Sequence, residues 1–363
     1  MIHRIIALII KELQEQVSTA RGVAVLIIPI LLQTLLFPFV ATQDLTNCKV
    51  AVYCQDTGPY SAEFLQRLSA APYITEVRML YSEHALRDCL DRRQCMAAIH
   101  IPPTFSAHCA QGSTAPIQVI GDGQRSNSSR IATGYISGIL NTLFTDTAPP
   151  ADTPVIRHLY NPNLSFKWFI LTCLFGMLGM ITSMNISCMA LAKEREAGTF
   201  EQLCVTPLST FEMLIGKIVP ATLILIVQCS VIYAVATLGY GLPVHGSVPA
   251  LFTALVIYSL ALAGIGFSIS AFCATQQQAF IGMFCFLLPA VLLSGFLAPV
   301  ENMPRFLQYL THINPLYYIF SITRGIFLKG YTFADIAPRL AILFSMASAS
   351  LLLAYTTLRR TCS

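Results

Sequence analysis

The chain has 363 residues, of which 55% are hydrophobic and only 11% are charged, and its formal net charge is +4 at pH 7. A soluble globular protein carries roughly 25% charged residues, so this composition excludes an ordinary soluble chain and indicates a polytopic membrane protein. The small net charge also argues against a nucleic-acid-binding chain. The charges are unevenly placed, because 10 of the 22 Lys and Arg and 10 of the 18 Asp and Glu lie between Thr42 and Lys167.

The N-terminal residues 1–21 predict an amphipathic helix that lies on the cytoplasmic membrane surface. Isoleucines recur at helical spacing from Ile2 to Ile10, with charged residues between them. A signal-peptide start is the alternative, but the apolar run that follows is too long and lacks a small-residue cleavage site. Residues 22–41 form that run and predict the first transmembrane helix, since about 20 apolar residues cross a bilayer core.

Residues 42–167 predict an inserted extracytoplasmic α/β domain, because strand-like and helix-like segments alternate along them. Ser82 is the expected N-cap of one of these helices. The predicted strands are Cys48–Cys54, Ile74–Leu80, Met96–Ile101 and Pro116–Ile120.

The inserted domain contains an odd number of cysteines and no Cys-x-x-Cys pair, so a zinc or redox motif is not indicated and no metal site is expected. These cysteines are Cys48, Cys54, Cys89, Cys95 and Cys109. A disulfide among them stays open if the domain faces an oxidising compartment, and the sequence does not identify the pair.

Residues 168–363 predict a membrane domain with transmembrane helices two to six, so the fold class is an α-helical polytopic membrane protein with six transmembrane helices. Residues 299–337 are apolar but too interrupted to span, and they predict a re-entrant or interfacial segment. The five predicted spans are Phe169–Ala192, Leu214–Leu238, Val248–Cys273, Ala279–Ala298 and Pro338–Leu358.

Basic residues in the short flanks of these spans predict that both termini lie in the cytoplasm. With this orientation eight basic residues are inside: Arg4, Lys11, Arg21, Lys193, Arg195, Lys217, Arg359 and Arg360. Four are outside, leaving out the inserted domain: Arg305, Arg324, Lys329 and Arg339. The segment that begins at Lys193 is then cytoplasmic.

The chain carries no recognisable energy source of its own. The cores of the six predicted spans hold no Asp, Glu or His, which argues against an ion-coupled carrier. No P-loop is present, because Gly216-Lys217-Ile218 has Phe211 where the first glycine of that motif belongs. Lys217 is instead expected to extend toward water from a helix end. Any uphill transport is therefore expected to draw on a separate subunit, and this chain is expected to be neither an enzyme nor a cofactor-binding protein.

A charged segment between the second and third spans, KEREAGTFEQLCVTPLS at residues 193–209, resembles the cytoplasmic loop of type-2 ABC exporter permeases. Three further motifs resemble the same family, so the resemblance covers essentially the whole chain. They are Asn161-Pro162-Asn163-Leu164 with Trp168-Phe169, Leu293-Ser294-Gly295 with Pro299 and Glu301-Asn302-Met303-Pro304, and Asn314-Pro315-Leu316-Tyr317-Tyr318.

The resemblance implies a permease subunit of an inner or plasma membrane that works as a homo- or heterodimer with a separate ABC ATPase subunit. ATP and Mg would be used by that ATPase, and the cargo would be a drug, a lipid or another hydrophobic compound. Membrane lipid and a periplasmic adaptor are further expected partners. The identity of the cargo and of the adaptor stays open.

In this family the loop at residues 193–213 meets the ATPase. The expected coupling residues are Lys193, Glu194, Arg195, Glu196, Gly198, Thr199, Glu201, Leu203 and Pro207. The first four are expected to form charge pairs across that interface, and Gly198 to Leu208 to transmit ATPase closure. The alternative is that Glu194 and Arg195 merely pair with each other at the surface, which contributes only ~0–1 kcal/mol.

Polar residues near the spans are candidates for the path of the cargo. The candidates are Gln33, Asn185, Gln228 and Ser294, against the alternative that such residues bond neighbouring helices. Glu301 and Arg324 are expected at an outer gate, against the alternative of a loop ion pair. The competing function is a membrane-anchored sensor or assembly scaffold whose outer domain binds a ligand or partner.

Overall fold

The computed structural model describes residues 2–18, 20–40, 48–92, 94–111, 116–121, 126–147, 166–206 and 208–362. The chain divides into two compact units, one formed by Met1–Ala41 with Leu159–Ser363 and the other by Thr42–His158. Pro207, the 161–164 motif and the side chain of Leu203 lie outside the described residues.

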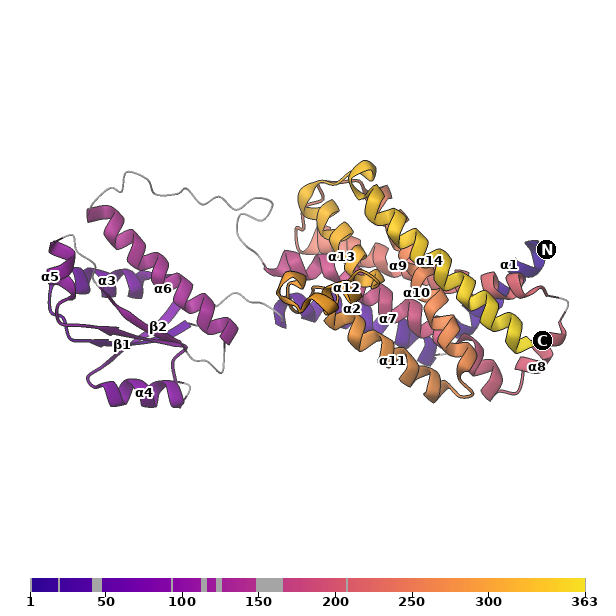
Figure 1. The fold of residues 1–363 in the computed structure, drawn as a ribbon, viewed down its shortest axis with the longest axis horizontal. Helices are drawn as coiled ribbons and strands as arrows, with labels where there is room; N and C mark the ends of the chain where they lie inside the picture. The colour runs from indigo at the N-terminus through magenta and orange to yellow at the C-terminus, as the bar shows by residue number, and fades with distance from the viewer. Residues whose placement is uncertain are drawn as a thin grey trace. The chain divides into compact units, whose positions relative to one another are not determined.

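The unit at Thr42–His158 is an α/β domain built on one sheet (Figure 1). The strands are β1 (Cys48–Cys54), β2 (Ile74–Leu80), β3 (Ala97–Ile101) and β4 (Gln118–Gly121), in the order β2-β1-β3-β4. β1 runs parallel to β2 and β3, and β4 is antiparallel to β3. All four strands lie where the sequence pattern predicts them, to within two residues at each end, and the largest difference is at β4, which begins two residues after Pro116.

Helices cover both faces of this sheet. They are α3 (Pro59–Ala70), α4 (Glu83–Asp91), α5 (Phe105–Ala110) and α6 (Ser126–Thr147). Because side chains alternate along a strand, Val50 and Val52 of β1 pack with α3, α5 and α6, while Ala51 packs with α4 on the other face. Ser82 caps α4 as predicted, since its hydroxyl accepts the Ala85 N–H at 3.1 Å.

The other unit is helical. Its elements are α1 (Ile2–Ser18), α2 (Ala20–Val40), α7 (Phe166–Glu196), α8 (Phe200–Val205), α9 (Thr210–Ala234) with the π-helical turn η2 (Val235–Gly239), α10 (Val248–Phe272), α11 (Gln276–Leu292), η3 (Val300–Asn302), α12 (Arg305–Thr311), α13 (Pro315–Arg324) with η4 (Gly325–Lys329), and α14 (Phe333–Cys362).

Four described helices are long and apolar enough to cross a membrane: α7, α9 with η2, α10 and α14. A fifth span results if Ile2–Ser18 and Gly22–Leu36, bent by 89° to one another, count as one. The prediction of a polytopic helical membrane protein is confirmed at this level. The predicted fifth span, Ala279–Ala298, is wrong in extent, because α11 has only 17 residues and ends at Leu292. The predicted re-entrant segment, residues 299–337, is also too long at its C-terminal end, since α14 begins at Phe333.

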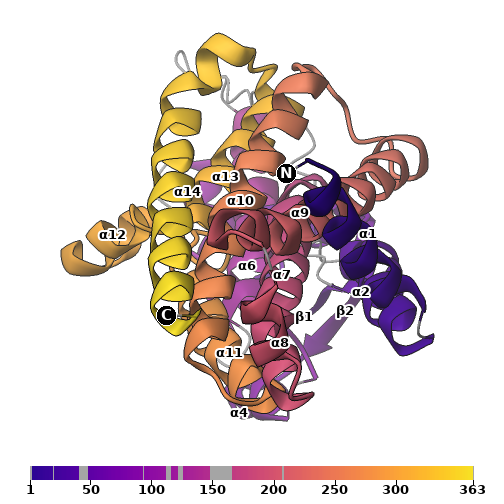
Figure 2. The ribbon, with the colours of Figure 1, turned by 90° about the vertical axis from the view of Figure 1, so that its right-hand side faces the viewer.

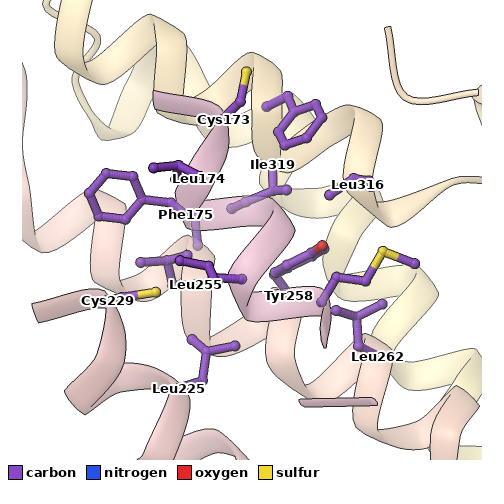
Figure 3. Close-up of a cluster of buried hydrophobic side chains, with 14 of the residues drawn as sticks. Cys173, Leu174, Phe175, Leu225, Cys229, Leu255, Tyr258, Leu262, Leu316 and Ile319 are labelled. Atoms are coloured by element: carbon purple, nitrogen blue, oxygen red, sulfur yellow. The ribbon is translucent and has the colours of Figure 1, made fainter. Parts of the chain in front are cut away.

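α7 lies at the centre of the helical unit, and its large buried side chains meet α9, α10 and α13 (Figure 3). Small residues let the helices approach closely, as is usual in membrane interiors. A Cβ on Gly176 would lie 2.7 Å from the Phe320 ring, and the Tyr258 hydroxyl donates to the Gly176 carbonyl at 2.9 Å. α7 therefore packs closely against several helices at once.

Candidate functional site: the charged end of the helical unit

The charged segment predicted as the coupling loop lies at one end of the helical unit. This end also holds α1 and the C-terminal end of α14 (Figures 1 and 2). The grouping places the N-terminus, the C-terminus and α8 on the same side of the membrane spans.

The end of α7 is closed by a glycine cap. Gly198 has a φ of +71°, in the left-handed region that favours glycine. The Gly198 N–H donates to the Arg195 carbonyl at 3.0 Å and the Thr199 N–H donates to the Glu194 carbonyl at 2.9 Å. This pair of bonds is a Schellman motif, and it turns the chain sharply from α7 into α8.

The four charges that precede this cap each bind a partner within the chain. Lys193 pairs with Glu15 of α1 at 2.5 Å. The Arg195 guanidinium donates to the Cys273 carbonyl at the end of α10 at 2.9 Å and lies over the Phe200 ring. The Glu196 carboxylate accepts the Gln276 N–H at the start of α11 at 2.9 Å. Arg195 and Glu196 therefore satisfy opposite ends of the α10–α11 turn, as helix dipoles favour.

Glu194 points inward to a buried lysine rather than to Arg195. Its carboxylate lies 3.3 Å from the Lys217 ammonium and 3.5 Å from Lys11, and it accepts a hydrogen bond from the Thr199 hydroxyl. Among the described ion pairs, none joins Glu194 to Arg195. The alternative in which these two residues pair with each other at the surface is therefore wrong.

Lys217 contradicts the sequence-based expectation that it extends to water. Its side chain is 0% exposed, and its ammonium donates to Glu12 at 2.7 Å and to the Ala190 carbonyl at 3.0 Å. A lysine seven residues inside α9 cannot reach water here because α1 covers it. Glu12 and Leu8 are the two buried residues of α1.

We call the six charges that join α1, α7 and α9 the ionic cluster. Its members are Lys11, Glu12, Glu15, Lys193, Glu194 and Lys217. Gly216 lets α1 approach, since a Cβ there would lie 2.3 Å from a Leu8 methyl group. The pairing of Glu12 with Lys217 was missed in the sequence, because the two residues lie 205 apart along the chain and are brought together only by the packing of α1 on α9.

α8 lies at the surface of the charged end of the helical unit. Glu201 and Val205 of α8 are exposed, and a shallow surface pocket of ≈ 320 Å³ is lined by Arg195, Gly198, Phe200 and Glu201. The chain then enters α9 through a capping box, in which the Ser209 hydroxyl accepts the Glu212 N–H and the Glu212 carboxylate accepts the Ser209 N–H. α8 is thus held between two capped helix ends.

The residues predicted to line a cargo path make different contacts, and among the described residues no hydrogen bond joins any two of them. Gln228 accepts a hydrogen bond from Thr182 at 2.6 Å and donates to the Leu26 carbonyl at 3.1 Å, so it joins α9 to α7 and α2. Ser294 is buried, and within its own turn its hydroxyl donates to the Val291 carbonyl at 2.6 Å and accepts the Phe296 N–H at 3.2 Å. Gln33 in α2 and Asn185 in α7 are half-buried.

The two residues predicted at an outer gate, Glu301 and Arg324, do not contact the same groups. Arg324 lies over the rings of Phe169 and Phe320, with centroid distances of 4.8 and 5.9 Å. Glu301 is exposed in η3. In the described part of the chain no ion pair joins Glu301 to Arg324, and no group of three or more His, Cys, Asp or Glu is placed to hold a metal ion.

Comparison with known proteins identifies the family. Residues 21–356 match the model of the ABC-2 family transporter proteins. The chain is 41% identical over 334 residues to the probable multidrug ABC transporter permease YbhR of Escherichia coli K12, and the match covers 91% of each chain. It is 24% identical over 366 residues to the probable multidrug ABC transporter permease YbhS of the same organism, covering 98% of this chain and 96% of that one.

A third relative is the inner membrane transport permease YhhJ of Escherichia coli K12, 28% identical over 285 residues and matched over 75% of each chain. The family consists of membrane transport subunits, for which a partner ATPase hydrolyses ATP. The resemblance seen in the sequence is therefore confirmed. The chain belongs to the ABC-2 family and is the membrane permease subunit of an ABC exporter, a multi-pass inner-membrane protein that works in a dimeric arrangement with an ABC ATPase.

Proposed function

We propose that this permease exports a hydrophobic or amphipathic compound, such as a drug or a lipid, from the cytoplasm or the inner leaflet. Two relatives carry names that describe multidrug permeases, and the chain matches them over most of its length. The sensor or scaffold alternative is not favoured, because the family is one of transport subunits. ATP and Mg²⁺ are used by the ATPase, and this chain binds neither.

The proposed topology has six spans, with α2 and α11 joining the four long helices, both termini in the cytoplasm, and residues 42–167 outside. The basic residues of the short flanks favour this orientation. The common position of α1, α8 and the end of α14 supports it. The exposed apolar residues Ile2, Ile6 and Ile10 of α1 support a helix in the membrane interface, in contact with lipid.

The ATPase is proposed to bind α8 and the turns beside it, from Gly198 to Pro207. The observation that carries this proposal is that the charges at the end of α7 are bound within the chain while residues of α8 are exposed. The charges at 193–196 bind α1, α10 and α11 inside the chain, whereas Glu201 and Val205 stay exposed on α8. Lys193 to Glu196 would then transmit the movement of α8 to the spans, and Glu201 would contact the ATPase directly.

The cargo path is proposed to run beside α7 and α11 at the axis of the permease dimer, where Gln33, Asn185, Gln228 and Ser294 are the polar candidates. Gln228 and Ser294 already bond within the chain, so Asn185 and Gln33 are the stronger pair. Glu301 and Arg324 are proposed near the outer end of this path. A periplasmic adaptor would bind the outer domain.

The test is co-purification from native membranes in mild detergent, followed by ATPase activity of the complex. Glu201→Arg is expected to release the ATPase. The reversal puts a positive charge where the ATPase surface would complement a negative one, and a like-charge contact in an interface costs several kcal/mol. Glu83→Arg is the matched control, since it reverses another exposed glutamate, which lies in the first turn of α4 in the domain proposed to be outside. Retention of the ATPase by Glu201→Arg, with unchanged activity, contradicts the proposed role of α8.

A further inference from the structure

The α/β domain holds five cysteines, and they lie on two different faces of its sheet. Cys48 is buried at the start of β1, among the side chains that face α3 and α6. The Cys54 thiol donates to the Asp56 carbonyl at 3.1 Å. Cys109 lies in α5 and packs against the edge of the same cluster. None of these three shares a contact cluster with Cys89 or Cys95.

Cys89 and Cys95 lie together on the opposite face of the sheet. Both are almost fully buried, and they form one small cluster with Ala51, Leu86 and Ala98. The Gln94 N–H donates to the Cys89 carbonyl at 2.9 Å, which holds the residue before Cys95 at the end of α4. Burial, and next the adjoining Cys89 thiol, raises the pKa of Cys95 to about 12.

We propose that Cys89 and Cys95 form a disulfide that fastens α4 to the sheet. The inference rests on the proposed position of this domain outside the cytoplasm, where disulfides form and persist. It selects one pair from five cysteines, which the sequence alone does not do. The two cysteines are also members of one small buried cluster, so their side chains lie close together.

The disulfide would strengthen the attachment of α4 to the sheet. α4 has nine residues, and only Leu86 and Cys89 among them are buried. A helix held by two buried side chains gains little from packing, so a covalent bond from Cys89 to Cys95, two residues before β3, adds a further constraint. The bond closes a short loop and limits the freedom of the unfolded chain.

The chemistry is an ordinary thiol–disulfide exchange. One thiolate of the pair attacks a protein disulfide donor of the extracytoplasmic compartment and forms a mixed disulfide. The second thiolate then displaces the donor's sulfur, so the pair loses two protons and two electrons and the donor is reduced to a dithiol. Because burial raises the thiol pKa in the folded domain, the reaction belongs to the folding stage, when both thiols are exposed.

The test counts oxidised cysteines in the full-length protein from acid-quenched cells. Free thiols are blocked with N-ethylmaleimide in denaturant, the sample is reduced, and a maleimide-polyethylene glycol is added. Two of the 12 cysteines are expected to gain the label. Cys54→Ala with Cys109→Ala is the matched control and keeps two labels, whereas Cys89→Ala with Cys95→Ala has none.

The pair is identified by trypsin digestion without reduction. Cleavage after Arg87, Arg92, Arg93 and Arg125 predicts that peptides 88–92 and 94–125 stay joined in the Cys109→Ala variant. A wild-type protein with no labels, or labels that survive in Cys89→Ala with Cys95→Ala, overturns the inference.

Co-purification of the ATPase from a second, unquenched portion of the same cells separates this inference from the proposed function. If the ATPase co-purifies but no label is found, the disulfide is wrong and the exporter stands. If the two labels appear but no ATPase co-purifies, the disulfide stands and the proposed coupling to α8 is wrong.

Discussion

Lys217→Ala is expected to lower the stability of the helical unit by about 3–5 kcal/mol. Removing one partner of a buried ion pair leaves an uncompensated buried charge, and such losses are of this size. Here Glu12 and Glu194 would face each other without the ammonium between them. The measurement is the midpoint of thermal unfolding in detergent, together with the yield of monodisperse protein.

Lys11→Ala is the control for this prediction. Lys11 contacts the same Glu194 carboxylate at 3.5 Å, but its side chain is 56% exposed. Exposed pairs contribute roughly 0–1 kcal/mol, so a small change is expected. Lys217→Met with Glu12→Leu should recover part of the loss, since an apolar pair of similar size often replaces a buried ion pair at little cost. A Lys217→Ala protein as stable as Lys11→Ala would show that the cluster does not hold α1 on the spans.

Gly264→Ala is expected to destabilise the contact between α10 and α14 by about 1–3 kcal/mol, the usual cost of overpacking. A Cβ at this position would lie 2.5 Å from the Ser350 hydroxyl and 2.7 and 2.9 Å from backbone atoms of Ser350 and Leu351. Backbone atoms cannot rotate away, so the two helices must separate. The measurement is again the unfolding midpoint in detergent.

Gly138→Ala is the matched control for Gly264→Ala. It makes the same change inside α6, where a Cβ meets nothing within 4 Å. Alanine is favoured over glycine in a helix by roughly 1 kcal/mol, so this protein should be as stable as wild type or slightly more stable. Equal behaviour of the two variants would contradict the close packing of α10 on α14.

The sequence predicts the α/β domain well because its signals are local. Alternation in Ile74–Leu80 and the cap at Ser82 each depend on neighbouring residues, and both are confirmed. The long apolar runs likewise predict α7, α9, α10 and α14. The boundaries of α11 and α14 were predicted less well, because apolar residues continue beyond a helix end such as Leu292.

The functional end of the helical unit was predicted only in part. The family motif locates α8 and the glycine cap at Gly198, which are local features. The partners of Lys193 and Lys217 were not predictable in this way, since Glu12 lies 205 residues from Lys217 along the chain. Burial of Lys217 depends on α1 folding back over α9, and no local pattern encodes that contact.

The central claim is that α8 is the surface that meets the ATPase, and site-specific photo-crosslinking tests it most directly. A photoreactive amino acid at Val205 is compared in native membranes with one at Leu238, because these two residues are 85% and 88% exposed at opposite ends of the third span. We expect a crosslinked product with the ATPase from position 205 and none from position 238. A product from position 238 alone, or from neither position in a complex that hydrolyses ATP, would contradict the proposed coupling.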